Sequence, residues 1–354
     1  MHVIMGFELK TLVDGASGFD MVIDVRSPSE FAEDRIPGAV SMPVLSDAER
    51  AHVGTIYAQE SAFKARKIGA ALVARNAARH IEGPLAEMGG GWRPLVYCWR
   101  GGQRSASFAS ILSQIGWRAE TVEGGYSSYR RLVVQLLYDT AFPASVVLLD
   151  GNTGTAKTEV LNRAAESGVQ AIDLERMANH RGSVLGGQGE QPSQKWFESC
   201  LAAEVAALDP DRPVVIEAES SKVGRLSIPP RVFEAMKAAR RIRIEAPVSA
   251  RAGYLTRAYQ DLVNDKILLL ERLDRLQRLQ GREKVAHWKA LAEGGSYQEL
   301  AEGLIRDHYD PRYAKVRGRR SMGPESVIAA ENLGDKDLDR LAGKVGALVS
   351  QPGP

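Results

Sequence analysis

The sequence predicts an α/β protein with two domains, one over residues 1–140 and one over residues 141–354. A chain of 354 residues is too long for one ordinary hydrophobic core. Short apolar runs alternate with amphipathic segments through the first 250 residues, which is typical of α/β units with parallel sheets. A predicted helix ends near Tyr138 and Pro143 precedes a new apolar run, so we place the boundary between them.

Apolar runs of strand length locate the predicted strands, and amphipathic runs locate the predicted helices. The strands are Met21–Val25, Leu95–Cys98, Glu120–Val122, Ser145–Asp150, Gln170–Leu174, Val214–Glu217 and Arg241–Glu245. The helices are Arg104–Ile115, Tyr129–Tyr138, Lys157–Ser167 and Gln194–Leu208. From about residue 250, leucines recur at helical spacing among many charges. This predicts a helical, basic C-terminal part, either one long helix or a helical hairpin, packed on the α/β core; a coiled-coil dimer is the alternative.

Composition excludes several classes of protein. With 44% hydrophobic and 25% charged residues, the chain is not a disordered one. We find no apolar run long enough to span a bilayer and no signal peptide, so we expect a cytoplasmic protein without a membrane partner. Two cysteines exclude a disulfide framework and a cysteine-rich zinc site.

The first candidate site is a loop that begins at Cys98, between a predicted strand and a predicted helix. Backbone amides and the helix dipole converge at such a position and favour the thiolate, which predicts a nucleophile. Gly101, Gly102 and Gln103 form the loop that would hold an anion, and Arg104 can add a bidentate contact. A buried apolar cysteine is the alternative, and it is the reading we prefer for Cys200, for which a resolving role is the second possibility.

The second candidate site is a phosphate loop over residues 151–158, GNTGTAKT, which follows a predicted buried strand. It matches the Walker A pattern, except that Ala156 replaces the last glycine. We expect Gly151, Gly154 and Lys157 to bind a diphosphate, and Thr158 to be a candidate ligand for Mg²⁺. We expect Ala156 to adopt helical dihedral angles and its methyl group to crowd the anion.

Polar residues follow two further predicted strands, at the edge where α/β folds place their ligands. They are Asp173, Glu175, Asn179, His180, Arg181, Ser183, Glu217 and Glu219. For Glu217 and Glu219, simple solvation at a strand end is the alternative.

Basic residues cluster in two places. The larger cluster is Arg312, Lys315, Arg317, Arg319 and Arg320, and the smaller one is Arg240, Arg241 and Arg243. Each is either a solvated surface or a phosphate-binding footprint.

The first domain resembles the rhodanese family over about residues 5–135. The resemblance rests on Asp24-Val25-Arg26, on the segments 27–31 and 35–39, and on the Cys98 loop, in this order. It implies that Cys98 handles sulfur or a related element. Cys98 and Arg104 enclose five residues, one more than in the usual rhodanese loop. A Cys-x5-Arg loop also resembles rhodanese-like phosphatases and arsenate reductases, in which it cradles a tetrahedral oxyanion.

Together, the rhodanese-like domain, the phosphate loop, the run Asn179-His180-Arg181-Gly182-Ser183 and the segment Glu217-Ala218-Glu219-Ser220 resemble the tRNA 2-selenouridine synthase family over about residues 5–330. The resemblance implies a transferase that replaces sulfur by selenium in wobble 2-thiouridine of tRNA. It implies selenophosphate as donor, geranyl diphosphate as co-substrate, an S-geranyl-2-thiouridine intermediate and no tightly bound cofactor. Cys98 would then deliver selenium, the phosphate loop would bind geranyl diphosphate, and the larger basic cluster would contact tRNA.

Three other functions stay open from the residues alone. One is a P-loop NTPase or kinase with a regulatory rhodanese domain, and another is a sulfur-relay adaptor without enzymatic activity. A phosphatase that uses the Cys98 loop is the third.

Overall fold

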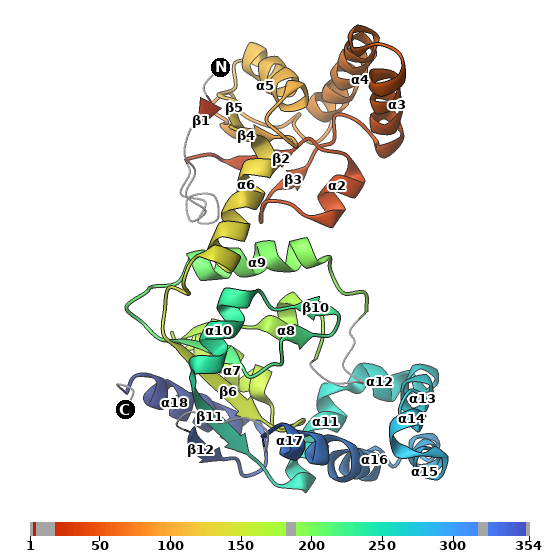
Figure 1. Ribbon diagram of the computed structural model, residues 1–354, viewed down its shortest axis with the longest axis vertical. Coiled ribbons are helices and arrows are strands. Elements are labelled where there is room, and N and C mark those ends of the chain that lie inside the picture. Colours follow the sequence, from red (N-terminus) through yellow and green to blue (C-terminus); the bar gives the residue numbers. More distant parts are fainter. Residues whose placement is uncertain (1–2, 5–17, 182–188, 318–324, 352–354) are drawn as a thin grey trace. The chain divides into compact units, whose positions relative to one another are not determined.

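The computed structural model describes residues 3–4, 18–181, 189–317 and 325–351. The chain divides into two compact units (Figure 1). Unit 1 comprises Met1–Ala141 and Pro192–Ala207, and unit 2 comprises Phe142–Gln191 and Leu208–Pro354. Each unit contains one five-stranded parallel sheet, so the predicted α/β class is confirmed.

The sheet of unit 1 has the strand order β1-β5-β4-β2-β3. Its strands are β1 (Val3–Ile4), β2 (Met21–Asp24), β3 (Val40–Ser41), β4 (Pro94–Tyr97) and β5 (Glu120–Val122). The central strand β4 is buried along its whole length, as expected for an uninterrupted apolar run covered on both faces. The two-residue strands β1 and β3 lie at the edges and were too short to be predicted.

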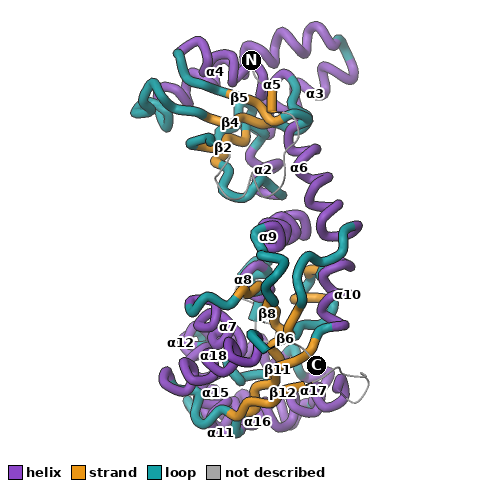
Figure 2. Tube along the Cα trace, turned by 90° about the vertical axis from the view of Figure 1, so that its left-hand side faces the viewer, coloured by secondary structure: helices purple, strands orange, loops and turns teal. Residues whose placement is uncertain are grey.

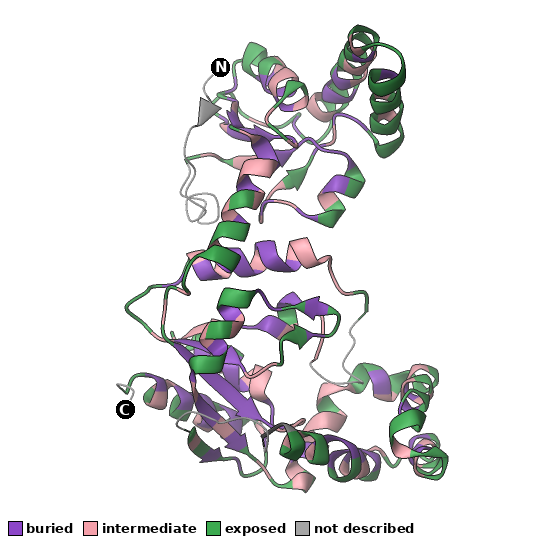
Figure 3. Ribbon diagram, viewed as in Figure 1, coloured by how far each residue is buried: buried purple, intermediate pink, exposed green. Residues whose placement is uncertain are grey.

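Among its described residues, unit 1 has seven helical segments. They are α2 (Pro28–Glu33), α3 (Asp47–Gln59), α4 (Ala62–Glu82), α5 (Gln103–Ile115), α6 (Gly125–Val134), the π-helix η1 (Gln135–Asp139) and α9 (Gln194–Ala206). A capping box, in which Ser46 and Glu49 bond each other's backbone N–H, starts α3. Only Ile56 of α3 is buried, and Figure 3 shows this helix as almost entirely exposed. Such a helix lacks the apolar stripe by which sequence patterns are recognised, which is why α3 was not predicted.

Helix α9 belongs to unit 1 although its sequence lies within the predicted second domain. Arg130 of α6 forms an ion pair with Glu198, and the Lys195 ammonium lies 2.6 Å from a carboxylate oxygen of Glu33. The Arg35 guanidinium lies 3.7 Å from the ring centroid of Trp196. The predicted continuous domain over 141–354 is therefore interrupted by residues 192–207. Cys200, on this helix, is half-buried.

The sheet of unit 2 has the strand order β12-β11-β6-β8-β7. Its strands are β6 (Val146–Gly151), β7 (Gln170–Ile172), β8 (Val214–Glu217), β11 (Arg240–Glu245) and β12 (Glu325–Ala329). The elements between them are α7 (Lys157–Glu166), α8 (Leu174–Met177), the hairpin β9 (Lys222–Val223) and β10 (Leu226–Ser227), and α10 (Pro230–Ala238). Figure 2 shows the strands of this sheet flanked by helices.

The smaller basic cluster lies on β11, and its charges are used inside unit 2. Arg241 pairs with the buried Asp150, Arg243 pairs with Glu325, and Arg240 donates to backbone carbonyls at the end of the last helix. These arginines therefore have partners within unit 2, as the contacts of a folded domain require.

The predicted helical character of the part after residue 250 is confirmed, but in place of one long helix or a helical hairpin the chain forms a lobe of short helices. They are α11 (Val248–Ala258), α12 (Gln260–Asn264), α13 (Lys266–Asp274), α14 (Gln277–Gln280), α15 (Arg282–Glu293), α16 (Tyr297–Leu304), the π-helix η2 (Ile305–Tyr309) and α17 (Asp310–Arg317). Gly281 at φ +85° separates α14 from α15 and permits the chain reversal. Leu262, Leu273 and Trp288 pack in a core of the lobe's own. In the described part of the chain, no helix has the length and hydrophobicity needed to cross a membrane.

After the lobe the chain returns to the sheet through β12 and ends in α18 (Asp335–Val349). Leu338, Leu341 and Val345 of α18 lie in the core cluster of the sheet. Asp337 fixes the segment that precedes this helix, because its Oδ2 accepts hydrogen bonds from the N–H groups of residues 331, 332 and 333 at 2.7–3.0 Å. Burial raises the pKa of Asp337, but these N–H groups and Arg340 outweigh burial and lower the pKa to about 2.

Replacing Asp337 by asparagine should lower the free energy of unfolding at pH 7 by about 2 kcal/mol, the value that the shift from 3.8 to about 2 implies. A lowered carboxyl pKa stabilises the fold above the unfolded value and loses this effect as the pH falls through the folded value. The difference between wild type and variant should therefore persist to about pH 4 and fall to about half by pH 3. Urea unfolding at pH 7, 4 and 3 measures it.

Asp339→Asn on the same helix is the matched control, because Asp339 is 68% exposed and pairs with Arg163 at the surface. It should change stability by less than about 1 kcal/mol. An Asp337→Asn variant as stable as this control would contradict the assigned role.

Candidate active sites: a cysteine loop and a phosphate loop

Cys98 lies directly after β4, and α5 begins five residues later at Gln103. The thiol is 3% exposed, and its Sγ lies 3.2 Å from Oγ of the fully buried Ser105. A hydroxyl at this distance can donate a hydrogen bond to the thiolate form of the cysteine. Ser105 was not predicted as a site residue, although the sequence signals it by its position next to Arg104.

The backbone of the loop is fixed from behind by the start of α6. The N–H of Tyr126 donates to the carbonyl of Cys98, and the N–H of Ser127 donates to that of Trp99, both at 2.9 Å. Gly101 has φ +63°. A Cβ on Gly125 would lie only 2.2 Å from the carbonyl oxygen of Cys98. Glycine is therefore required at both positions for the loop to curl against α6.

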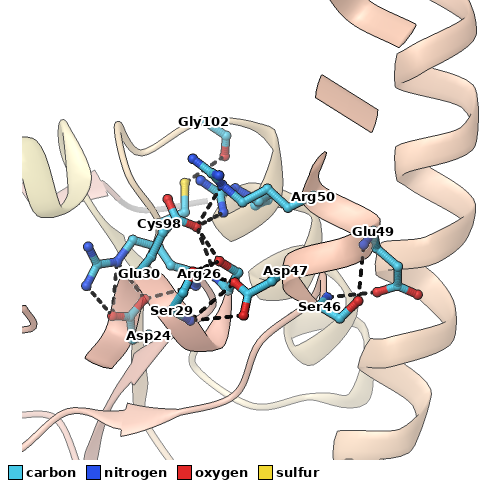
Figure 4. A network of polar contacts seen from close by, with 12 residues as sticks. Asp24, Arg26, Ser29, Glu30, Ser46, Asp47, Glu49, Arg50, Cys98 and Gly102 are labelled. Atoms are coloured by element: carbon cyan, nitrogen blue, oxygen red, sulfur yellow. Dashed lines mark hydrogen bonds and ion pairs between the residues drawn. The ribbon is translucent and has the colours of Figure 1, made fainter. Parts of the chain in front are cut away.

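Arg104 is held by a buried carboxylate rather than left free beside the loop. Its Nη1 donates to Oε2 of Glu30 at 2.9 Å. Nε of Arg50 lies 3.1 Å from the same oxygen of Glu30 (Figure 4). Burial raises the pKa of Glu30, but Arg104, the N–H of Ser27 and Arg50 outweigh it and lower that pKa. Glu30 Oε1 is buried and has no hydrogen-bond partner among the residues that the structure describes. The loop therefore has two arginines beside it that already share one carboxylate.

The phosphate loop follows β6, and α7 begins at Lys157. Ala156 adopts the left-handed region with φ +59°, so the expected helical dihedral angles are wrong. This conformation costs a non-glycine residue roughly 1 kcal/mol or more. The methyl group of Ala156 lies in the core cluster with Val160 and Leu161. Its burial there offsets part of the strain.

A buried arginine braces this loop. Nε and Nη2 of Arg251 donate to the carbonyl of Thr153 at 2.9 and 2.8 Å, and its guanidinium forms a bidentate pair with Asp310. Asp310 also accepts a bond from Asn152 at 2.7 Å, and Tyr313 Oη lies 3.4 Å from Thr153 Oγ1. Asp310 and Tyr313 come from a helix, and they lie 158 and 160 residues further along the chain than Asn152 and Thr153; no sequence signal pointed to them.

The predicted carboxylates meet beside Lys157 because β7, β8 and β6 end at one edge of the sheet. Thr158 Oγ1 donates to Glu217 and, at 3.1 Å, to Glu175, while Glu175 and Glu219 share a hydrogen bond. Glu217 is fully buried, so solvation at a strand end is the wrong interpretation for it.

Burial and mutual repulsion raise the pKa values of the three glutamates, so these carboxyl groups are partly protonated at neutral pH. Burial is the main cause that raises the pKa of Glu175 to about 8 and that of Glu219 to about 7, and Glu217 is raised as well. Burial lowers the pKa of Lys157, but Tyr313 and the three glutamates outweigh it, so Lys157 stays charged. The site thus offers a fixed cation beside carboxyl groups that exchange protons near neutral pH.

The oxygen donors at Thr158, Glu175 and Glu217 are the type that Mg²⁺ prefers. Asp173 Oδ2 is buried and has no hydrogen-bond partner within the described part of the chain. Among the described residues, no group of three or more acidic, histidine or cysteine side chains has the arrangement of a metal site. A Mg²⁺ ion here would therefore take most of its ligands from phosphate oxygens and water.

The remaining predicted polar residues line one cavity of about 520 Å³ with the phosphate loop. Asn179, His180 and Arg181 lie on its wall together with Asp173 and Glu175. Burial, and then the charge of Arg272, lower the pKa of His180. Arg181 is oriented by Asp261 at 2.9 Å and by the ring of Tyr259. Ser183 lies outside the described residues.

The larger basic cluster is only partly described. Arg312 and Lys315 are exposed on α17, and Arg317 ends that helix. Arg319 and Arg320 lie outside the described residues.

The fold and the two loops define an enzyme that joins a rhodanese-like domain to a P-loop domain. The sequence model of the rhodanese-like domain family matches residues 8–132. The sequence model of the tRNA 2-selenouridine synthase AAA domain family matches residues 144–328. The chain belongs to the tRNA 2-selenouridine synthase family, and the resemblance inferred from its motifs is confirmed.

Full-length relatives carry the same family name. The tRNA 2-selenouridine synthase of Aeromonas salmonicida is 37% identical over 334 residues, which cover 84% of this chain and 88% of that protein. Those of Pseudomonas fluorescens and Psychromonas ingrahamii are both 32% identical. The first match covers 91% of this chain and 95% of the relative, and the second covers 82% and 86%.

Glu175→Gln should stabilise the protein at alkaline pH. A carboxyl group whose pKa rises from 4.5 to about 8 on folding destabilises the fold increasingly as the pH rises through this range. The gain from the substitution should be small at pH 5 and on the order of 1–3 kcal/mol at pH 8.5. Urea unfolding at the two pH values measures it.

Glu166→Gln is the control, because Glu166 is an exposed residue at the end of α7. It should leave stability unchanged within about 0.5 kcal/mol at both pH values. A gain for Glu175→Gln that does not grow with pH would refute the raised pKa.

Proposed function

We propose that the protein replaces the sulfur of wobble 2-thiouridine in tRNA by selenium, in the cytoplasm, through an S-geranyl-2-thiouridine intermediate. The observation that carries this proposal is the presence in one chain of two separate glycine-containing loops, one with a buried thiol and one with a half-buried lysine. Geranyl diphosphate and selenophosphate are anions that suit these two loops.

The first reaction is assigned to the phosphate loop of unit 2. The thiocarbonyl sulfur attacks C1 of geranyl diphosphate, the C–S bond forms, and the C1–O bond breaks. Diphosphate leaves with the electron pair, and the proton on N3 of the base passes to water. Lys157 and the loop amides stabilise the charge that develops on the leaving diphosphate. Mg²⁺, when bound near Thr158, would supply further positive charge to the same oxygens.

The second reaction is assigned to the Cys98 loop of unit 1. The Cys98 thiolate attacks the phosphorus of selenophosphate, so that an S–P bond forms and hydroselenide leaves with the electrons of the P–Se bond. Hydroselenide adds at C2 of the base, and geranyl thiol leaves. Water then hydrolyses the phosphocysteine to phosphate. Each step is redox-neutral, and Arg104 with the loop amides would hold the phosphoryl oxygens.

The basic cluster at α17 is proposed to contact tRNA phosphates. Arg312 and Lys315 are exposed on one helix, and Arg317, Arg319 and Arg320 continue the run of positive charge. Such contacts add affinity that falls with salt and does not depend on sequence.

Nucleoside mass spectrometry tests the proposal directly. Thiolated tRNA is incubated with the protein, geranyl diphosphate and selenophosphate, and then digested. Geranylated 2-thiouridine and 2-selenouridine are the expected products. Unchanged 2-thiouridine together with ATP turnover would favour an NTPase or kinase, and a persulfide on Cys98 without a change in the base would favour a sulfur-relay adaptor.

Cys98→Ser should retain geranylation and reduce the rate of selenation by about 10³-fold or more, as expected when a nucleophile is removed. Mass spectrometry of the two products separates the effects. Cys200→Ser is the matched control and should perform both reactions at the wild-type rate. Normal selenation by Cys98→Ser would show that the thiol is not the nucleophile.

Lys157→Ala should slow geranylation by about 100-fold, because the diphosphate loses its charged partner. Selenation of tRNA that is already geranylated should continue at the wild-type rate. Lys237→Ala, at an exposed position of α10, is the control. Equal loss of both reactions in Lys157→Ala would contradict the division of labour between the two loops.

A further inference from the structure

A second cavity lies in unit 2 beside the phosphate loop, within the helical lobe. It is a narrow, open-sided slot of about 70 Å³, much smaller than the polar cavity of about 520 Å³. Its wall is formed chiefly by aliphatic side chains of α12, α13 and α16, among them Leu262, Val263, Leu269, Leu300 and Leu304.

The slot and the polar cavity meet at the phosphate loop. Thr153 of this loop, Leu255 and Tyr259 line both cavities. Thr153 is also the residue whose carbonyl Arg251 holds in place. A ligand whose phosphates occupy the loop therefore has an apolar channel next to its attachment point.

The polar atoms in the wall of the slot already have partners. Tyr297 Oη donates to the carbonyl of Val263 at 3.3 Å, and Thr256 Oγ1 donates to the carbonyl of Ala252 at 3.0 Å. The slot offers apolar contact and little hydrogen bonding. Nucleobases and sugars lose hydrogen bonds to water in such a place, whereas a hydrocarbon chain gains from leaving water.

A packing defect is the simpler explanation for a cavity in a small helical core. Voids left by imperfect packing are few and small, because protein interiors are close-packed. This slot shares Thr153 of the phosphate loop with the polar cavity, and Val263 on its wall is only half-buried. The chain leaves apolar surface open where the loop would hold the head of a ligand.

We propose that the slot binds the hydrocarbon tail of the ligand whose diphosphate occupies the phosphate loop, which makes the loop a site for prenyl diphosphates rather than nucleotides. The proposal rests on the proposed function for the identity of the geranyl chain. It adds the location of that chain, with the diphosphate at residues 151–158 and the tail directed past Thr153 between α12 and α16.

Affinity measurements on the wild-type protein provide the first test. Competition binding compares inorganic diphosphate, dimethylallyl diphosphate, geranyl diphosphate and ATP. Geranyl diphosphate should bind at least about 100-fold more tightly than inorganic diphosphate, because burial of ten carbons contributes even when it is incomplete. Dimethylallyl diphosphate should be intermediate, and ATP should gain nothing over inorganic diphosphate. Equal affinity for geranyl and inorganic diphosphate would overturn the proposal.

Val263→Trp provides the second test, because a larger side chain at this half-buried position fills the slot. The KM for geranyl diphosphate should rise at least about 10-fold, while the affinity for inorganic diphosphate should stay within about twofold of wild type. Ile267→Trp is the matched control, because Ile267 is 74% exposed on α13 and does not line the slot. An unchanged KM in Val263→Trp would overturn the proposal. If this variant does not fold, the competition binding of the four ligands to the wild-type protein tests the proposal alone.

The two proposals can fail separately. If geranyl diphosphate binds through its tail but no nucleoside is alkylated, the proposed function is wrong, whereas the assignment of the slot to the hydrocarbon tail still holds. If tRNA is geranylated but the chain length of the diphosphate does not affect affinity, the reaction stands and the slot is not the site of the tail.

Discussion

The buried guanidinium of Arg251 is the interaction on which the arrangement of unit 2 around its phosphate loop depends. It holds a loop carbonyl through two N–H groups and a carboxylate of the helical lobe through two more. A buried cation must be fully paired, so neither partner can move away without a large cost. The charged pair therefore fixes the lobe, and with it the apolar slot, to the phosphate loop.

The carboxyl groups next to Lys157 give this site a second property. They hold protons near neutral pH because they are buried close to one another. A bound diphosphate would bring more negative charge and raise their pKa values further. Anion binding and proton uptake are thus coupled at the loop, which reduces the net charge that must be buried.

The parts of the fold that could be predicted are those in which one segment carries its own signal. Buried strands such as β6 and β8 are uninterrupted apolar runs, and the two anion loops are marked by glycines next to a cysteine or a lysine. Helix α3, which is mostly polar, and strand β12 (Glu325–Ala329), in which polar and apolar residues are mixed, have no such pattern. Contacts between residues far apart in the sequence, such as that of Asp310 with Asn152 across 158 residues, could not be predicted, because no local pattern specifies a partner. The left-handed conformation of Ala156 is imposed by the loop against the preference of the residue.

Glu30 pairs with Arg104 and therefore competes with any anion that would bind this arginine at the Cys98 loop. An oxyanion that binds Arg104 would have to replace Glu30 as its partner. Glu30 belongs to the same chain, so it competes at a constant effective concentration. Singly charged anions compete poorly with a carboxylate of equal charge, whereas a doubly charged phosphoryl group competes well. With the phosphoryl donor proposed above, this arrangement would select ligands by charge, and it would also speed release, because Glu30 would pair with the arginine again once the phosphoryl group had been hydrolysed.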